Sequence, residues 1–196
     1  MPLQQGSVRH QLAAAAAKRI AEGEPDYRRA LVKAAESLAP ANASDWPSLE
    51  EIDKAVAGHQ ALFASPQHSI DLKALRLAAC DLMRELAGYG PRLYGPVATG
   101  TAISHSAILL ELAVSPRDSK DFEIELLNRG WPFEAGVGAS SSKSDATQHY
   151  QVAWKRNDAL ITLAGERFEA ANRHWNLRLN EHQLSALLDA SGPDKN

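Results

Sequence analysis

The spacing of apolar residues changes once along this chain, at the breakers Gly88, Gly90 and Pro91. Before that point apolar side chains recur every three or four positions, which is the spacing of amphipathic helices. After it come apolar runs of five to eight residues, bounded by glycine, serine and aspartate, which is typical of strands. The change predicts an α+β protein with a small mixed β-sheet flanked by helices and an N-terminal helical region.

Four helices are expected ahead of the change, over residues 7–21, 26–38, 48–63 and 69–87. Ser48 is followed three positions later by Glu51, the pattern of a capping box, and so predicts where the third helix begins. We assign residues 1–88 to a helical region and residues 89–190 to an α/β core. The helix at 69–87 is expected to form one compact unit with that core.

The second half alternates between strand and helix signals. Helices are predicted at 115–128 and 181–190, because Ser115–Pro116 is a good helix start and Gly192–Pro193 a good stop. A loop is expected from Gly136 to Thr147, and a tight turn at 155–158. Strands are predicted at 93–97, 107–114, 131–133, 150–154 and 159–163.

Composition narrows the function classes. The formal net charge of −3 argues against nucleic acid as a partner, and the single cysteine, Cys80, excludes an intrachain disulfide or a thiolate metal cluster. No apolar run reaches the length of a membrane span, so no membrane partner is expected. The alanine-rich stretch 12–17 precedes its charges, Lys18 and Arg19, and so predicts a helix rather than a signal peptide. We therefore expect a cytoplasmic protein, and the composition favours a bacterial one.

The segment from Tyr94 to Leu112 reads YGPVATGTAISHSAILLEL. It resembles the signature of the nucleotidyltransferase superfamily that includes DNA polymerase beta, and the resemblance extends over residues 69–163. There a strand and a glycine-serine turn precede a short helix and a strand with two acids, and a later strand carries a third acid. Residues two apart on a strand share a face, so such acids converge on a pair of magnesium ions.

This resemblance implies a ligand site at the glycine turn and the segment after it, where backbone N–H groups approach phosphates. The ligand-binding residues that it implies are Gly95, Gly100, Thr101, Ser104 and Ser106. Thr101 and Ser104 also have a structural interpretation, as turn and cap residues of the short helix.

The chain departs from the family pattern at each chemical position. The expected acids fall on Ala107, Leu109 and Leu160, and none of these side chains can bind a cation. Pro96 replaces the serine of the turn and removes a backbone donor. Glu111 is one acid on the same face, which we interpret as a solvated or hydrogen-bonded edge residue. No metal site is predicted, and magnesium bound together with a nucleotide is not supported.

The leading hypothesis is therefore a nucleotidyltransferase-like pseudoenzyme that binds a nucleotide, a small phosphate ligand, a protein partner or a second copy of itself. A second hypothesis is an active transferase or another enzyme that uses His105, Glu111 or basic residues such as Lys155 and Arg156. A third is a helical protein-interaction module with a small sheet. Strand order separates them, because the resemblance requires the strands at Leu93, Ala107 and Ala159 to share one mixed sheet.

Overall fold

The structure is a computed structural model that describes residues 7–22, 24, 27–63, 66–137, 148–165 and 177–190. The chain divides into a helical unit, residues 1–72 and 100–106, and a sheet unit, residues 73–99 and 107–196. The predicted α+β class with an N-terminal helical region is confirmed. In the described part of the chain, no helix is both long and apolar enough to cross a membrane.

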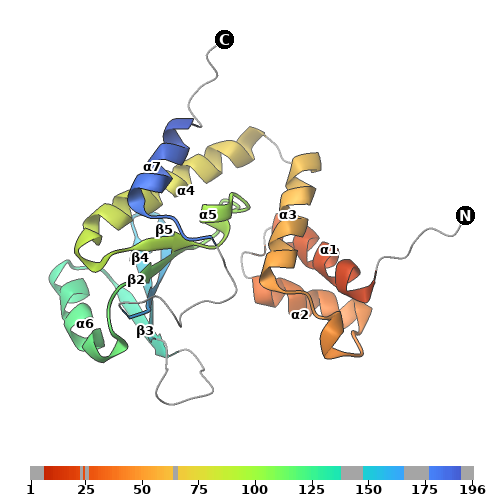
Figure 1. Ribbon diagram of the computed structural model, residues 1–196, viewed down its shortest axis with the longest axis horizontal. Helices are drawn as coiled ribbons and strands as arrows, with labels where there is room; N and C mark the ends of the chain where they lie inside the picture. Colours follow the sequence, from red (N-terminus) through yellow and green to blue (C-terminus); the bar gives the residue numbers. More distant parts are fainter. Residues whose placement is uncertain are drawn as a thin grey trace, which may run out of the picture. The chain divides into compact units, whose positions relative to one another are not determined.

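The helical unit is built around α1 (Val8–Ala21), which packs against both α2 (Tyr27–Leu38) and α3 (Leu49–Phe63) (Figure 1). The 3₁₀ helix η1 (Ala43–Asp45) lies in the connection between α2 and α3. Small side chains on the buried side of α1 let its neighbours approach closely. The buried residues of α1 are Leu12, Ala13, Ala16, Ala17 and Ile20.

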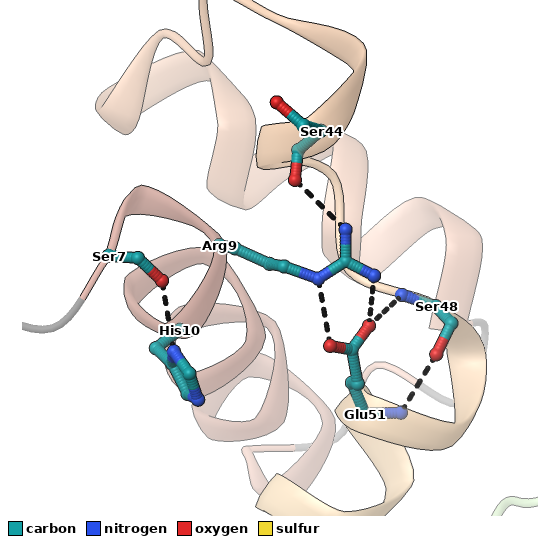
Figure 2. A network of polar contacts seen from close by, with 6 residues as sticks. All are labelled: Ser7, Arg9, His10, Ser44, Ser48 and Glu51. Atoms are coloured by element: carbon teal, nitrogen blue, oxygen red, sulfur yellow. Dashed lines mark hydrogen bonds and ion pairs between the residues drawn. The ribbon is translucent and has the colours of Figure 1, made fainter.

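The predicted capping box at the start of α3 is confirmed. The Ser48 backbone N–H donates to Glu51 Oε2 at 2.7 Å, and the Glu51 backbone N–H donates to Ser48 Oγ at 3.2 Å. Figure 2 shows that the same Glu51 carboxylate also accepts hydrogen bonds from the guanidinium group of Arg9 on α1. The signal that begins α3 therefore also joins it to α1.

The sheet unit contains five described strands in the order β1-β2-β5-β4-β3. Helix α4 (Pro66–Glu85) enters this unit at Lys73, and α7 (Glu181–Ala190) runs beside it (Figure 1). The strands are β1 (Arg92–Tyr94), β2 (Ile108–Leu112), β3 (Phe133–Val137), β4 (Gln148–Trp154) and β5 (Asn157–Leu163). Between them lie α5 (Pro96–Thr99) and α6 (Ser119–Asn128), with the 3₁₀ helices η2 (Ala87–Tyr89) and η3 (Pro116–Asp118).

The sheet is mixed, because β2 and β5 are parallel while the other neighbouring strands are antiparallel. Leu109 of β2 lies opposite Leu160 of β5. Leu179 forms a further antiparallel bridge to Leu93 at the β1 edge. The three strands singled out by the sequence thus share one mixed sheet. Of the positions of the expected acids, Leu109 and Leu160 are paired, whereas Ala107 lies just before β2.

The two faces of the sheet differ sharply in polarity. On one face β2, β5 and β4 present buried apolar residues, and α6 packs there through Phe122, whose ring centroid lies 5.3 Å from that of Tyr150. Cross-strand partners share a face, so the opposite face carries a polar row. Its members, from β1 to β4, are Arg92, Glu111, Thr162 and His149.

Several predicted boundaries were wrong. The strand predicted at 93–97 ends at Tyr94, because Gly95 adopts a φ of +73° and Pro96 starts the short helix α5. The strand predicted at 131–133 begins at Phe133 and continues to Val137, into the region expected as a loop. The turn between β4 and β5 is two residues long, with Lys155 at a φ of +54°. The remainder of the loop expected from Gly136 to Thr147, which is residues 138–147, lies outside the described residues.

Candidate functional site

The Gly95 turn connects β1 to α5 and is covered by an apolar side chain. Gly95 is buried and its φ of +73° favours glycine. A Cβ atom at this position would lie 2.6 Å from Leu109 Cδ1. The Leu109 side chain therefore lies directly against the turn and occupies the space that any other residue at position 95 would need.

The positions at which the resemblance implied acids lie together. Leu109 and Leu160 are cross-strand partners, and Ala107 precedes Leu109 by two residues on the same strand path. All three are partly exposed. The face beside the Gly95 turn is thus apolar where metal-binding carboxylates would stand.

Glu111 is the buried acid of this face, and its charge is matched by an arginine that arrives from the C-terminal part of the chain. Arg178 Nε donates to Glu111 Oε2 at 2.7 Å, and Arg178 Nη2 donates to Glu111 Oε1 at 3.1 Å. Glu111 is 0% exposed and lies on β2, an inner strand. Of the two environments expected for Glu111, solvated or hydrogen-bonded, the structure has the hydrogen-bonded one, but the residue is not at an edge of the sheet. Leu179 pairs beside β1, and Arg178 next to it reaches this face.

Next to Glu111 in the polar row is a hydrogen-bonded chain across three strands. Thr162 Oγ1 lies 2.9 Å from His149 Nδ1 and 3.4 Å from the Tyr94 hydroxyl. Thr162 is fully buried, and burial lowers the pKa of His149.

Residues 100–106, which the sequence placed in the ligand site, belong to the helical unit. Thr101 Oγ1 donates to Asp53 Oδ1, and the Tyr27 hydroxyl donates to the same oxygen at 2.9 Å. Gln60 Nε2 donates to the Thr101 carbonyl at 3.0 Å. Burial and the neighbouring Asp53 charge raise the pKa of Tyr27 above its usual range. Thr101 is thus bound to α2 and α3, and the interpretation that it caps the short helix was wrong.

The other predicted residues of this segment have different environments. Gly100 starts it with a φ of +96°, and the Ser106 hydroxyl accepts a hydrogen bond from the Ile103 backbone N–H at 2.9 Å. Ser104 and His105 are exposed in the turn between them. His105 belongs to the helical unit and Glu111 to the sheet unit. The second candidate for catalysis, Glu111, has both oxygens occupied by Arg178.

Sequence reasoning missed Tyr94, His149, Thr162 and Arg178 as members of one site. A signal existed for two of them. Thr162 is the one hydroxyl in the apolar run Ala159–Leu163, and Arg178 stands between Leu177 and Leu179. An isolated polar residue in such a run indicates either an exposed position or a buried partner.

Among the described residues, no group of three or more histidine, cysteine or acidic side chains is placed to hold a metal ion. Comparisons of the chain with protein-family models, with curated proteins and with solved structures found no match.

Proposed function

We propose that this chain is a nucleotidyltransferase-like protein that has lost metal-dependent nucleotidyl transfer and acts by binding a ligand or a protein partner. The ligand site of this proposal is the face beside the Gly95 turn, where the resemblance implies phosphate binding. The observation that carries the proposal is the contact of Leu109 with Gly95, with Leu160 beside it.

Strand arrangement supports the nucleotidyltransferase part of the proposal. The resemblance requires a strand, a glycine turn, a short helix and a second strand that pairs with the strand of the third acid. The chain has β1, the Gly95 turn, α5 and β2 in that order, and β2 pairs in parallel with β5. The same order argues against a helical interaction module with an unrelated sheet.

Charge supports the loss of catalysis. Two-metal phosphoryl transfer needs several carboxylate oxygens directed at one point. Ala107, Leu109 and Leu160 offer none, and the Glu111 carboxylate is bound by Arg178. A carboxylate that accepts paired hydrogen bonds from a guanidinium group does not offer its oxygens to a cation. This arrangement also disfavours the alternative of an enzyme that uses His105 and Glu111.

Exposed apolar side chains support a protein partner as the second mode of action. In the helical unit, Leu62 is 77% exposed and Ile70 is 60% exposed. In the sheet unit, Ile124 and Leu127 are both exposed on α6, three residues apart on one side of the helix. Single exposed apolar residues are common on proteins, but neighbouring ones such as Ile124 and Leu127 are typical of surfaces that contact another protein, including a second copy of the chain.

The test is calorimetric titration of the purified protein with ATP, GTP, CTP and UTP, each with and without magnesium. We expect nucleotide binding whose affinity does not depend on magnesium, together with no transfer of nucleotide to any acceptor. Magnesium-dependent binding or nucleotidyl transfer would contradict the proposal. Absence of binding to every nucleotide would remove the nucleotide site and leave the protein-partner mode.

A matched pair of variants locates the binding. Leu109→Ala removes the side chain that covers the Gly95 turn, so it should change nucleotide affinity. Leu127→Ala makes the same substitution at an exposed position of α6, and nucleotide affinity should stay at the wild-type value. Equal affinities for both variants would place the nucleotide elsewhere on the molecule.

A further inference from the structure

Strand β3 forms an edge of the sheet, at the opposite end of the strand order from β1 (Figure 1). Among the described strands it pairs with β4 alone, and the register stays in step from Phe133↔Val152 to Val137↔Gln148, without a bulge. Residues 134–137 are exposed, and the strand contains neither proline nor lysine. An exposed edge without a bulge, a proline or a lysine is open to pairing with another strand.

The outer side of β3 carries a row of backbone N–H and carbonyl groups. The Pro132 carbonyl accepts a hydrogen bond from the Ala153 backbone N–H at 3.2 Å, and these two residues continue the β3–β4 register. Hydrogen-bonded pairs alternate along an antiparallel ladder, so Glu134 and Gly136 bond to β4, and residues 133, 135 and 137 face outward. None of the described residues is hydrogen-bonded to these outward backbone groups. The edge can therefore extend the sheet by one more strand.

The sequence of β3, Phe-Glu-Ala-Gly-Val, is complementary to itself in one antiparallel register. When two β3 strands meet about a twofold axis at Ala135, the outward groups of residues 133, 135 and 137 face those of residues 137, 135 and 133 in the second copy. Phe133 then lies opposite Val137, and Glu134 lies opposite Gly136. Apolar side chains meet apolar ones, and no acid lies directly opposite another acid, which would be destabilising.

The neighbouring registers are less favourable. A twofold axis at Glu134 would place two carboxylates directly opposite each other. A twofold axis at Gly136 would move Phe133 past the end of β3 in the second copy, and the apolar pair with Val137 would be lost. The axis at Ala135 uses all the outward groups of the strand, so the sequence favours a single register.

We propose that β3 pairs with β3 of a second copy of this chain, so that two five-stranded sheets become one continuous sheet across a twofold axis at Ala135. The proposal specifies the protein-partner mode of the proposed function, and it places the contact on a strand edge rather than on α6. β3 and the Gly95 turn, which follows β1, are at opposite ends of the strand order, so this pairing does not depend on nucleotide binding.

The first experiment measures the mass of the full chain by light scattering after size exclusion, over a series of concentrations. One strand pair is a small contact compared with the roughly 1,200–2,000 Å² of a standard interface. We therefore expect a dimer that dissociates on dilution. A chain that is monomeric at every concentration up to about 1 mM would overturn the proposal. The edge would then be left to another protein or to a segment of this chain outside the described residues.

The variant Ala135→Cys locates the contact. Hydrogen-bonded partners in an antiparallel pair have Cα atoms about 5.5 Å apart, so a short bis-maleimide should join two Ala135→Cys chains. The control is Ala153→Cys, at an exposed position of β4 one strand further in, which should yield little covalent dimer. The native Cys80 is buried and is common to both variants. Equal cross-linking of the two variants would overturn the placement at the β3 edge.

Two variants at Gly136 test the register. A Cβ atom on Gly136 would have nothing within 4 Å, so both variants should fold. Residue 136 faces Glu134 of the second copy, so Gly136→Lys should strengthen the dimer several-fold and Gly136→Glu should weaken it several-fold. Equal or reversed effects on the dissociation constant would overturn the register.

The same variants separate this inference from nucleotide binding. Gly136→Glu should bind nucleotide with wild-type affinity, and Leu109→Ala should dimerise as the wild-type chain does. Failure of the β3 pairing and failure of the nucleotide site are therefore distinguishable.

Discussion

The helical unit and the sheet unit each contain a forked arginine–glutamate pair, and the two pairs differ mainly in burial. In the helical unit, Arg9 Nε and Nη2 donate to the two oxygens of Glu51 at 2.8 and 2.6 Å (Figure 2). In the sheet unit, Arg178 makes the same fork on Glu111 at 2.7 and 3.1 Å. The side chains are 37% and 43% exposed in the first pair, but 22% and 0% exposed in the second.

Burial changes how much an arginine–glutamate pair contributes to the stability of the fold. Water solvates either partner of an exposed pair when the other is lost, so the pair adds little to stability. A buried carboxylate has no such alternative, and its arginine becomes a requirement of the folded state. Glu51 therefore helps to position α3 against α1, whereas Arg178 makes it possible for β2 to carry an acid on an inner strand.

Loss of Arg178 should have the largest effect. Arg178→Met removes the guanidinium group that is hydrogen-bonded to both oxygens of the buried Glu111 carboxylate, and we expect a loss of about 3–5 kcal/mol in the free energy of unfolding. Urea unfolding combined with hydrogen exchange of the β2 amides measures it. In the double variant Glu111→Gln/Arg178→Met the buried charge is gone, so much of the loss should be recovered. If Arg178→Met lowers the free energy of unfolding by less than the loss of the exposed Arg9–Glu51 pair does, Glu111 is solvated in solution.

The Gly95 turn gives the next largest effect. Gly95→Ala places a Cβ atom 2.6 Å from Leu109 Cδ1 and puts alanine at a positive φ, so we expect a loss of about 2–3 kcal/mol. Adding Leu109→Ala removes the overlap but not the backbone strain, and should recover part of the loss. If the double variant is less stable than Gly95→Ala by the full cost of a buried leucine, Leu109 does not lie on the turn.

In the helical unit, the Thr101 hydroxyl is predicted to matter more than the surface fork. Thr101→Val removes a donor to Asp53 from a position that is 3% exposed, and we expect a loss of about 1–2 kcal/mol. Thr101→Ser keeps the hydroxyl and should retain most of the stability. A larger loss in Thr101→Ser than in Thr101→Val, measured by urea unfolding, would assign the effect to packing of the threonine methyl group, because valine keeps that methyl group and serine does not.

The partners of Glu51 and Glu111 differ in how well the sequence could predict them. Local signals were sufficient for α1, α3 and α7, because periodicity, caps and turns are written in neighbouring residues. That β1, β2 and β5 share one sheet was expected from the resemblance and not from a local pattern. The capping box at Ser48 was predicted together with its partner, which lies three positions away. The Glu111 partner lies 67 positions away and depends on the bridge between Leu93 and Leu179, so no local pattern indicated it.

The candidate site was less predictable than the fold for the same physical reason. The apolar character of positions 107, 109 and 160 could be read directly from the chain. The polar row could not, because its members come from separate strands whose register sets which side chains meet. Thr101 was placed near the correct turn, but its partners Tyr27 and Asp53 follow from the packing of α2 and α3.

The exposed fork should give the smallest effect and a distinct pH dependence. Hydrogen bonds from Arg9 and from the Ser48 backbone lower the pKa of Glu51 from 4.5 to about 2. A carboxyl whose pKa is lower in the folded state binds protons more readily when unfolded, so its contribution is complete above pH 4.5 and declines as the pH falls toward 2. Glu51→Gln keeps the cap and removes the charge, and because the pair is exposed we expect a loss of only about 0.5 kcal/mol at pH 7. Urea unfolding of both proteins at pH 7 and pH 3.5 should show the difference between them shrinking at the lower pH. A difference that grows on acidification would mean that Glu51 acts through packing of α3 rather than through its charge.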